Sequence, residues 1–338
     1  MAALLALVAV SMFHMAAAQS ILPQLPTLNI DMEAISVSGV SAGAAFAIQF
    51  HVSYSHSIMG VGIIAGPPFY CAAGNVDIAV NNCMQMPDLI ITENLIAATE
   101  YAFTTDTIDD PKYISEDRVW VFTGEKDTVV VPGVVQKTDE YYQHWLSSDR
   151  LIFRTTVPAE HAWVTDFAGR NCSYLGDPYI NNCGFDAAGS MLTHFYDQNF
   201  TRAKSFNSSN LMRFDQSAYV VSKTPSLISL GDTGYVYIPT ACQSGNLTCK
   251  LHVVFHGCNQ DLETIGTQFV EETGMNEYAE ANNFVILYPQ ARRSKEVPYN
   301  PKGCFDWWGY TGIDYSCKTG SQVQTVARML KDLTGSFA

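Results

Sequence analysis

Short apolar segments alternate with longer segments of helical spacing along most of this chain. The apolar segments are rich in β-branched and aromatic residues, which predicts strands at 34–38, 60–66, 118–124, 150–156, 235–239, 251–255 and 284–289. Between them, the pattern predicts helices after residue 43 and around 90–101, 133–145, 186–196, 263–282 and 321–333. Such alternation is typical of an α/β fold with a mainly parallel central sheet and helices on both faces.

The segment 165–225 is rich in loops and interrupts this alternation. It contains no Pro/Ser/Thr-rich low-complexity run, so we interpret it as surface insertions rather than as a linker. Residues 1–18 are almost entirely apolar and end in three alanines, which is typical of a secretory signal peptide. We therefore expect a signal peptide at 1–18 and a single catalytic domain at 19–338.

Composition narrows the class of partner. The chain has 338 residues, 47% of them hydrophobic and 15% charged, which indicates a globular protein with a sizeable core. Its net charge of −14 argues against nucleic acid and anionic membrane surfaces as partners. We expect an acidic, monomeric protein that acts on a neutral or apolar substrate. No metal-ligand spacing or phosphate-binding loop is visible, so no metal or other cofactor is expected.

The cysteines also favour secretion. Among nine of them, close pairs at Cys71/Cys83, Cys172/Cys183 and Cys242/Cys249 would each close a small loop, and none has the C-x-x-C spacing of redox or zinc sites. A longer Cys258/Cys304 pair is compatible with the remainder and leaves Cys317 without a partner. Four N-glycosylation sequons agree with an extracellular location, at Asn171, Asn199, Asn207 and Asn246.

The motif that carries chemistry is G-x-S-x-G at residues 39–43. A strand is predicted before it and a helix after it, which is the setting of a nucleophile elbow. Ser41 would sit on a sharp turn, where side chains two residues away on either side would clash, and glycine avoids this clash. The N–H groups at the start of the helix point toward the same place and can hold a developing oxyanion.

Two further candidates follow predicted strands. Asp127 comes just after the strand at 118–124, and His161 comes just after the strand at 150–156. Functional groups gather at the carboxyl ends of parallel strands, and the order Ser, Asp, His is that of α/β-hydrolases. The alternative acid is Asp166, and the alternative base is His256.

His256 and Gly257 directly follow the strand at 251–255. A strand followed by His-Gly is typical of the oxyanion loop of esterases, in which a backbone N–H joins that of the residue after the nucleophile. Ordinarily this strand precedes the nucleophile elbow in the sequence, but here it lies far downstream. The order is that of a circularly permuted α/β-hydrolase fold, which termini close in space would permit.

Four segments together resemble the extracellular, single-domain poly(3-hydroxybutyrate) depolymerases of fungi. They are residues 35–43, 251–260, 285–291 and 303–307. The resemblance implies a circularly permuted α/β-hydrolase that hydrolyses short-chain polyhydroxyalkanoate esters. By the same resemblance, Ser41 is the nucleophile, Asp127 the orienting acid and His161 the base. It further implies the following: oxyanion donors at Ala42 and Cys258, a substrate-lining Trp307 and a Cys258–Cys304 disulfide. The chain departs from the family pattern at Phe305, where tryptophan is common, and we expect this change to alter the substrate crevice.

Two other functions fit the sequence. A secreted esterase acting on acetylated or feruloylated plant polysaccharide would use the same machinery with a different crevice. The second alternative is a non-catalytic binding protein with a hydrolase fold. The complete Ser/Asp/His set argues against it, because only catalysis requires all three residues.

Overall fold

A twisted sheet of eight strands forms the centre of the computed structural model, which describes residues 22–222 and 224–337. The predicted signal peptide at 1–18 lies outside the described residues. The strands, in their order across the sheet, are β4 (Leu151–Arg154), β3 (Arg118–Phe122), β2 (Gly60–Ile64), β1 (Ile30–Val40), β10 (Cys249–Phe255), β11 (Phe284–Tyr288), β9 (Thr233–Tyr237) and β8 (Leu211–Asp215). Strand β9 runs antiparallel to both of its neighbours, β11 and β8, and the other strands all point the same way. The prediction of an α/β fold with a mainly parallel sheet is confirmed.

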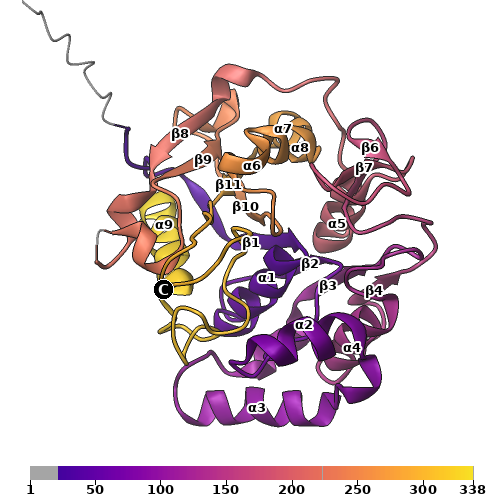
Figure 1. Cartoon of the computed structure of the whole chain (residues 1–338). Helices are drawn as coiled ribbons and strands as arrows, with labels where there is room; N and C mark the ends of the chain where they lie inside the picture. The colour runs from indigo at the N-terminus through magenta and orange to yellow at the C-terminus, as the bar shows by residue number, and fades with distance from the viewer. Residues whose placement is uncertain (1–21, 223, 338) are drawn as a thin grey trace, which may run out of the picture.

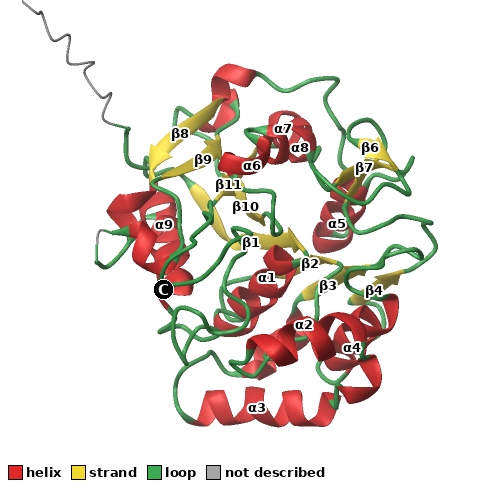
Figure 2. Ribbon diagram, viewed as in Figure 1, coloured by secondary structure: helices red, strands yellow, loops and turns green. Residues whose placement is uncertain are grey.

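Helices cover both faces of this sheet (Figure 1). On one face lie α1, α4 and α9, and on the other lie α5 and α8, which contact each other (Figure 2). The helices are α1 (Ala42–Ser53), α2 (Val76–Gln85), α3 (Thr92–Thr104), α4 (Pro132–Gln143), α5 (Ala187–Tyr196), α6 (Leu262–Ile265), α7 (Gln268–Glu272), α8 (Met275–Asn282) and α9 (Ser321–Thr334). Short 3₁₀ turns also occur at Pro87–Leu89, Pro111–Glu116, Ser208–Asn210, Gln216–Tyr219, Pro225–Ile228 and Thr240–Cys242.

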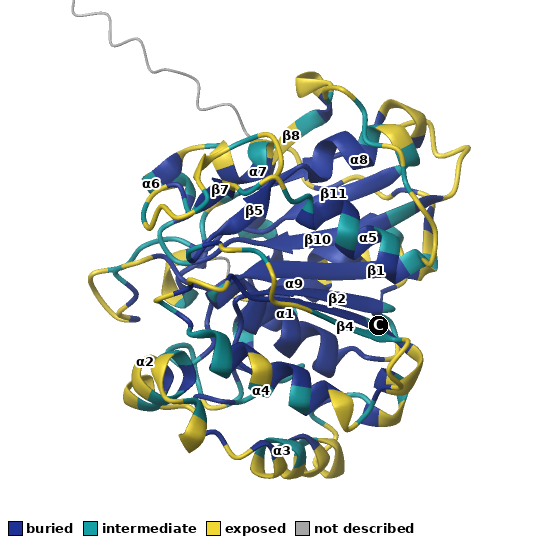
Figure 3. Cartoon of the chain, turned by 90° about the vertical axis from the view of Figure 1, so that its right-hand side faces the viewer, coloured by how far each residue is buried: buried dark blue, intermediate teal, exposed yellow. Residues whose placement is uncertain are grey.

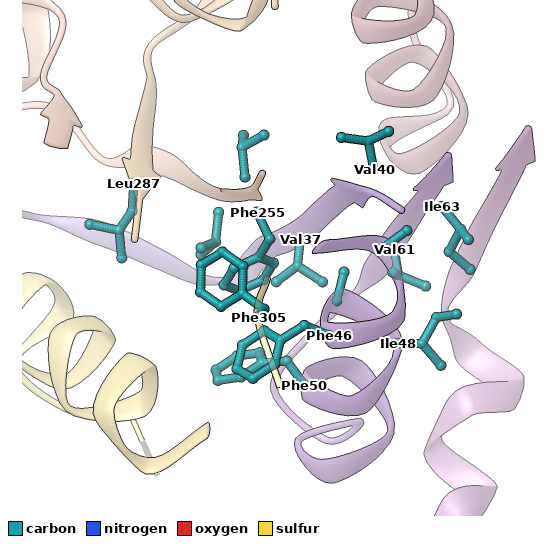
Figure 4. Close-up of a cluster of buried hydrophobic side chains, with 14 of the residues drawn as sticks. Val37, Val40, Phe46, Ile48, Phe50, Val61, Ile63, Phe255, Leu287 and Phe305 are labelled. Atoms are coloured by element: carbon teal, nitrogen blue, oxygen red, sulfur yellow. The ribbon is translucent and has the colours of Figure 1, made fainter. Parts of the chain in front are cut away.

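The central strands are buried on both sides (Figure 3). The middle strands are rich in Val, Ile, Leu and Phe, as expected when helices cover both faces of a parallel sheet. Figure 4 shows the aromatic centre of this core, where Phe46 and Phe50 of α1 pack against Phe255 at the end of β10. In the described part of the chain, no helix is long and apolar enough to cross a membrane.

The order of the strands in the sheet shows that the fold is circularly permuted. β10, with its oxyanion-type loop, comes late in the chain yet pairs in parallel with β1, which precedes the G-x-S-x-G motif. The register places Gly39 beside Phe255, so the two strands end at the same level. The two ends of the described chain also meet, because the N–H of Leu28 donates to the carbonyl of Leu333 at 2.8 Å. This arrangement confirms the circularly permuted order.

Three segments differ from the sequence-based predictions. The helix expected at 263–282 is three short helices, because Gly266 and Gly274 have positive φ angles (+61° and +84°), which interrupt a right-handed helix. The region 165–225 is not made of surface insertions alone. It supplies β8 of the main sheet and part of a second, three-stranded sheet, formed by β5 (Trp163–Thr165), β7 (Ile180–Asn182) and β6 (Arg170–Asn171). Helix α2 was not predicted, and it lies largely inside the loop closed by Cys71 and Cys83.

The structure contains four disulfides with the expected pairings: Cys71–Cys83, Cys172–Cys183, Cys242–Cys249 and Cys258–Cys304. Cys317 is half-buried and is the free cysteine of the described chain. The four sequon asparagines are all exposed: Asn171, Asn199, Asn207 and Asn246. Their glycosylation stays a prediction.

Candidate active site

Ser41 lies at the sharp turn between β1 and α1, with φ 57° and ψ −124°. Both glycines of the motif are required by close approach. A Cβ on Gly39 would lie 2.3 Å from the carbonyl carbon of Gly43, and a Cβ on Gly43 would lie 2.2 Å from the carbonyl oxygen of Phe255. The second glycine therefore allows the end of β10 to touch the first turn of α1. The strained turn holds the hydroxyl of Ser41 at the edge of the sheet.

Asp127 and His161 meet at the same edge of the sheet. Oδ2 of Asp127 lies 2.8 Å from Nδ1 of His161, and both side chains are almost fully buried. Oδ1 of Asp127 accepts hydrogen bonds from the N–H groups of Val129 and Val130, at 2.9 and 2.8 Å. These bonds fix the carboxylate, which in turn places the Nδ1 proton of the imidazole toward Asp127 and leaves Nε2 without a proton.

A second carboxylate ties the loops of Asp127 and His161 together. Glu160 accepts hydrogen bonds from the N–H and hydroxyl of Thr128, at 3.2 and 2.5 Å. It also accepts from the N–H of His161 at 2.6 Å. Glu160 therefore links Thr128, which follows Asp127, to the backbone of His161. No local pattern in the sequence indicates this contact, because Thr128 and Glu160 are 32 residues apart.

Two residues of the described chain with free backbone N–H groups, Ala42 and Cys258, line the same pocket as Ser41. Ala42 begins α1, where N–H groups have no partner inside the helix. Cys258 lies in the loop after β10, and its disulfide to Cys304 ties that loop to the segment at 303–312. Among the described residues, the N–H groups of Ala42 and Cys258 make no hydrogen bond within the protein. Both are free to bind an anionic oxygen.

These groups line a cavity of about 720 Å³ whose walls are mainly apolar. Ser41 and His161 both border it, although within the described structure the Ser41 hydroxyl makes no direct hydrogen bond to the imidazole. Separation of this kind is common before substrate binds. The walls come from α2, from the turn after Asp127 and from residues 299–311, which we call the aromatic segment. The apolar lining residues are Val76, Val80, Met84, Val129, Val130, Tyr299, Trp307, Trp308 and Tyr310.

Asp306 organises the aromatic segment. Its buried carboxylate accepts hydrogen bonds from the N–H groups of Trp308, Gly309, Tyr310 and Thr311, and from the hydroxyl of Thr311. Burial raises the pKa of this carboxyl above its ordinary value, and these hydrogen bonds act in the opposite direction. The carboxylate thus holds the backbone that carries the indoles of the pocket wall.

Phe305 does not alter the crevice directly, contrary to our expectation. Its ring is fully buried behind the pocket, 5.0 Å from Phe46 and 5.3 Å from Phe255 between ring centroids. It is absent from the pocket wall, which Trp307 does line. An aromatic ring at position 305 fills the core beneath the aromatic segment rather than contacting a ligand.

The alternative acid and base have other partners. Asp166 forms a bidentate ion pair with Arg202. His256 lies in the loop after β10 and bonds to backbone groups on both ring nitrogens. Two further histidines are buried inside the fold: His51 contacts Asp117 and Tyr142, and His252 lies between the hydroxyls of Ser36 and Ser38. The described residues contain no cluster of side chains suited to hold a metal ion.

Comparison with known proteins places the chain in a family. No family model matches it. The polyhydroxybutyrate depolymerase of Talaromyces funiculosus is 32% identical to it over 333 residues, which cover 95% of each chain. The chain belongs to the polyhydroxybutyrate depolymerases. The poly(3-hydroxybutyrate) depolymerase of Delftia acidovorans is 38% identical over 309 residues, and the match spans 90% of this chain but 60% of that longer relative.

Solved depolymerase structures share its fold. A PHB depolymerase from Penicillium funiculosum has a TM-score of 0.85 at 31% identity, covering 93% of this chain and 100% of the other. A serine-to-alanine PHB depolymerase complexed with an R3HB trimer has a TM-score of 0.86 with the same identity and coverage. The resemblance found in the sequence therefore extends over nearly all of the depolymerase fold.

Proposed function

We propose that this protein is a serine ester hydrolase that cleaves poly(3-hydroxybutyrate) or related short-chain polyhydroxyalkanoates. The observation that carries the proposal is the buried Asp127–His161 pair, which opens with Ser41 onto a large apolar cavity. A neutral, apolar polyester chain suits such a wall. The R3HB trimer bound to a structural relative supports the same substrate class.

In acylation, Ser41 Oγ attacks the carbonyl carbon of the ester while Nε2 of His161 takes the hydroxyl proton. The carbonyl oxygen becomes an oxyanion and accepts hydrogen bonds from the N–H groups of Ala42 and Cys258. When the intermediate collapses, the ester C–O bond breaks and His161 returns its proton to the departing alkoxide. The alcohol end of the polymer leaves, and the acyl group stays on Ser41.

Deacylation repeats these steps with water. His161 takes a proton from a water molecule, whose oxygen attacks the acyl carbon and forms a second oxyanion in the same place. Collapse breaks the bond to Ser41 Oγ, which recovers its proton from His161. The product is a hydroxy acid or oligomer with a free carboxylate. Asp127 stabilises the imidazolium that forms in both halves.

We further propose that the protein works outside the cell as a monomer. Four disulfides support folding in an oxidising compartment. The predicted signal peptide agrees with this location. A net charge of −14 disfavours nucleic acids and anionic membranes as partners.

The proposal is tested by comparing substrates with an active-site label. The secreted protein should release 3-hydroxybutyrate oligomers from poly(3-hydroxybutyrate), and an organophosphonate should modify Ser41 and stop the release. Acetylated and feruloylated xylan serve as comparators. Hydrolysis of the xylan esters without release from the polyester would assign the protein to carbohydrate esterases. Absence of both activities and of labelling at Ser41 would leave a non-catalytic hydrolase fold.

A further inference from the structure

The aromatic segment brings a positive charge to the substrate pocket. Lys302 lines the cavity that Ser41 borders, and it is exposed to solvent. No Asp or Glu is found among the described residues that line this cavity. Within the described chain, Lys302 also forms no ion pair, unlike Lys112, Lys137 and Lys318. In a protein of net charge −14, this ammonium group is available to an anionic part of a ligand.

Asn259 lies beside Lys302 on the same wall. Its backbone N–H donates to the carbonyl of Lys302 at 2.7 Å, and both residues line the cavity. Nη2 of Arg293 lies 2.9 Å from Oδ1 of Asn259, and a guanidinium group can only donate, so this bond fixes which way the amide faces. Nδ2 of Asn259 makes no hydrogen bond to any described residue, and it is therefore a second free donor next to Lys302.

Arg293 orients this amide but brings no free charge to the wall. Its Nε lies 3.4 Å from Oδ2 of Asp261, whose side chain is almost fully buried. The same carboxylate also accepts hydrogen bonds from the first turn of α6, so it is held in place. The charges of Arg293 and Asp261 thus offset each other, and the charge of Lys302 stays without a counterion in the described structure.

The chemistry of a hydroxybutyrate oligomer indicates what these donors would bind. Such an oligomer has a hydroxyl at one end, a carboxylate at the other and neutral esters between them. When an ester is cleaved, the acyl part carries the hydroxyl end and the leaving alcohol carries the carboxylate end. The one negative charge of the substrate therefore lies on the leaving-group side. Two neighbouring N–H donors, one of them charged, suit the two oxygens of a carboxylate.

We propose that Lys302 and Asn259 form a subsite for the terminal carboxylate of the leaving alcohol. The proposal rests on the proposed ester hydrolysis by Ser41. A segment in the interior of a polymer chain has no charge to offer, so the subsite favours soluble oligomers with a free acid end. A lysine that served only the solubility of the surface would give no such preference.

Two trimers of 3-hydroxybutyrate that differ only at this end test the subsite. One ends in the free carboxylate, and the other ends in a primary amide, which has nearly the same shape and no charge. For the wild-type protein at low salt, KM for the acid trimer should be about two- to fivefold below KM for the amide trimer. The values of kcat should be nearly equal, because the contact lies away from the reacting ester and binds substrate and transition state alike.

Three variants separate a local contact from a general effect of charge. Lys302→Gln should lose the preference for the acid trimer, and Lys302→Arg should keep it. Lys295→Gln is the matched control, because Lys295 is exposed, belongs to the same loop and does not line the cavity. It removes the same charge from the protein and should keep the preference. Salt at about 0.5 M should remove the preference from the wild-type protein by screening.

Equal KM values for the two trimers in the wild-type protein would overturn the subsite. An acid preference that survives in Lys302→Gln, or one that Lys295→Gln loses equally, would also overturn it. If Lys302→Gln fails to fold, the wild-type protein still decides, since a preference unchanged by salt would refute an ionic contact. Failure of the wild-type protein to cleave either trimer and to be labelled at Ser41 would instead overturn the proposed function.

Discussion

The replacement of Gly43 by alanine tests whether the contact between the elbow and the oxyanion loop governs activity. The added Cβ would lie 2.2 Å from the carbonyl oxygen of Phe255 and 2.4 Å from that of His256. A Cβ atom is essentially never found closer than 3.0 Å to another heavy atom, so the loop and α1 must separate by about 1 Å. Both opposing atoms are backbone atoms, and neither can rotate away.

Stability has two opposing contributions in Gly43→Ala. Alanine in a helix gains about 1 kcal/mol over glycine. Forcing an extra carbon into a packed core costs about 1–3 kcal/mol or more, and here the overlap is with backbone. The overlap therefore outweighs the gain, and we expect a lower Tm. Because a displacement of about 1 Å in a catalytic site can cost about a hundredfold, kcat should fall by a similar factor.

The assay is hydrolysis of p-nitrophenyl butyrate together with thermal unfolding. Gly231→Ala is the matched control, because a Cβ there meets its nearest atom at 3.5 Å and needs no rearrangement. The control should keep its kcat. A Gly43→Ala protein with a raised Tm and a kcat within about twofold of wild type would refute the reasoning, since helix propensity alone would then describe it.

Three further outcomes are expected. Asp127→Asn should lower kcat on p-nitrophenyl butyrate by about 10⁴-fold by favouring the wrong tautomer of His161; an active variant would exclude Asp127 as the orienting acid. Burial lowers the pKa of His252 to about 3 in the folded protein, whereas a histidine in the unfolded chain has a pKa of about 6.5. As the pH drops from about 6.5 toward 3, the unfolded chain therefore binds a proton that the folded protein does not, and the free energy of unfolding falls. Urea unfolding of His252→Gln should show a pH slope shallower by up to about 1.4 kcal/mol per unit, and an unchanged slope would contradict this. Replacing Cys258 and Cys304 together by serine should remove about 2–4 kcal/mol of unfolding free energy in urea, because the disulfide closes a separation of 46 residues; equal stability would count against that role.

The sequence predicted the elements whose signals are local. The G-x-S-x-G turn, the strands of the parallel sheet and the carboxyl-end positions of Asp127 and His161 all follow from short patterns. These patterns work because a buried parallel strand is almost continuously apolar, and functional groups gather at the carboxyl ends of such strands. The three disulfides between closely spaced cysteines could also be predicted, because each joins nearby positions in the sequence.

Contacts between residues far apart in the sequence could not be predicted from the sequence. Strand β8 has exposed residues at Met212 and Arg213, so it lacks the apolar run of a central strand, and only pairing with β9 makes it part of the sheet. The start of helix α2 is marked only by an N-cap residue, which the pattern of apolar positions does not reveal. The side chain of Asn75 accepts hydrogen bonds from the N–H groups of Asp77 and Ile78. The bond from Gln260 to the carbonyl of Pro178 spans 82 residues and leaves no local pattern.

Clearing of a poly(3-hydroxybutyrate) suspension by wild type and Ser41→Ala tests the central claim most directly. The account predicts that the wild-type protein clears the suspension and releases soluble hydroxy acids. Ser41→Ala should fold with an unchanged Tm and leave the suspension turbid. Clearing by Ser41→Ala at the wild-type rate would contradict the nucleophile, and a wild-type protein that hydrolyses p-nitrophenyl butyrate without clearing would contradict the polyester substrate.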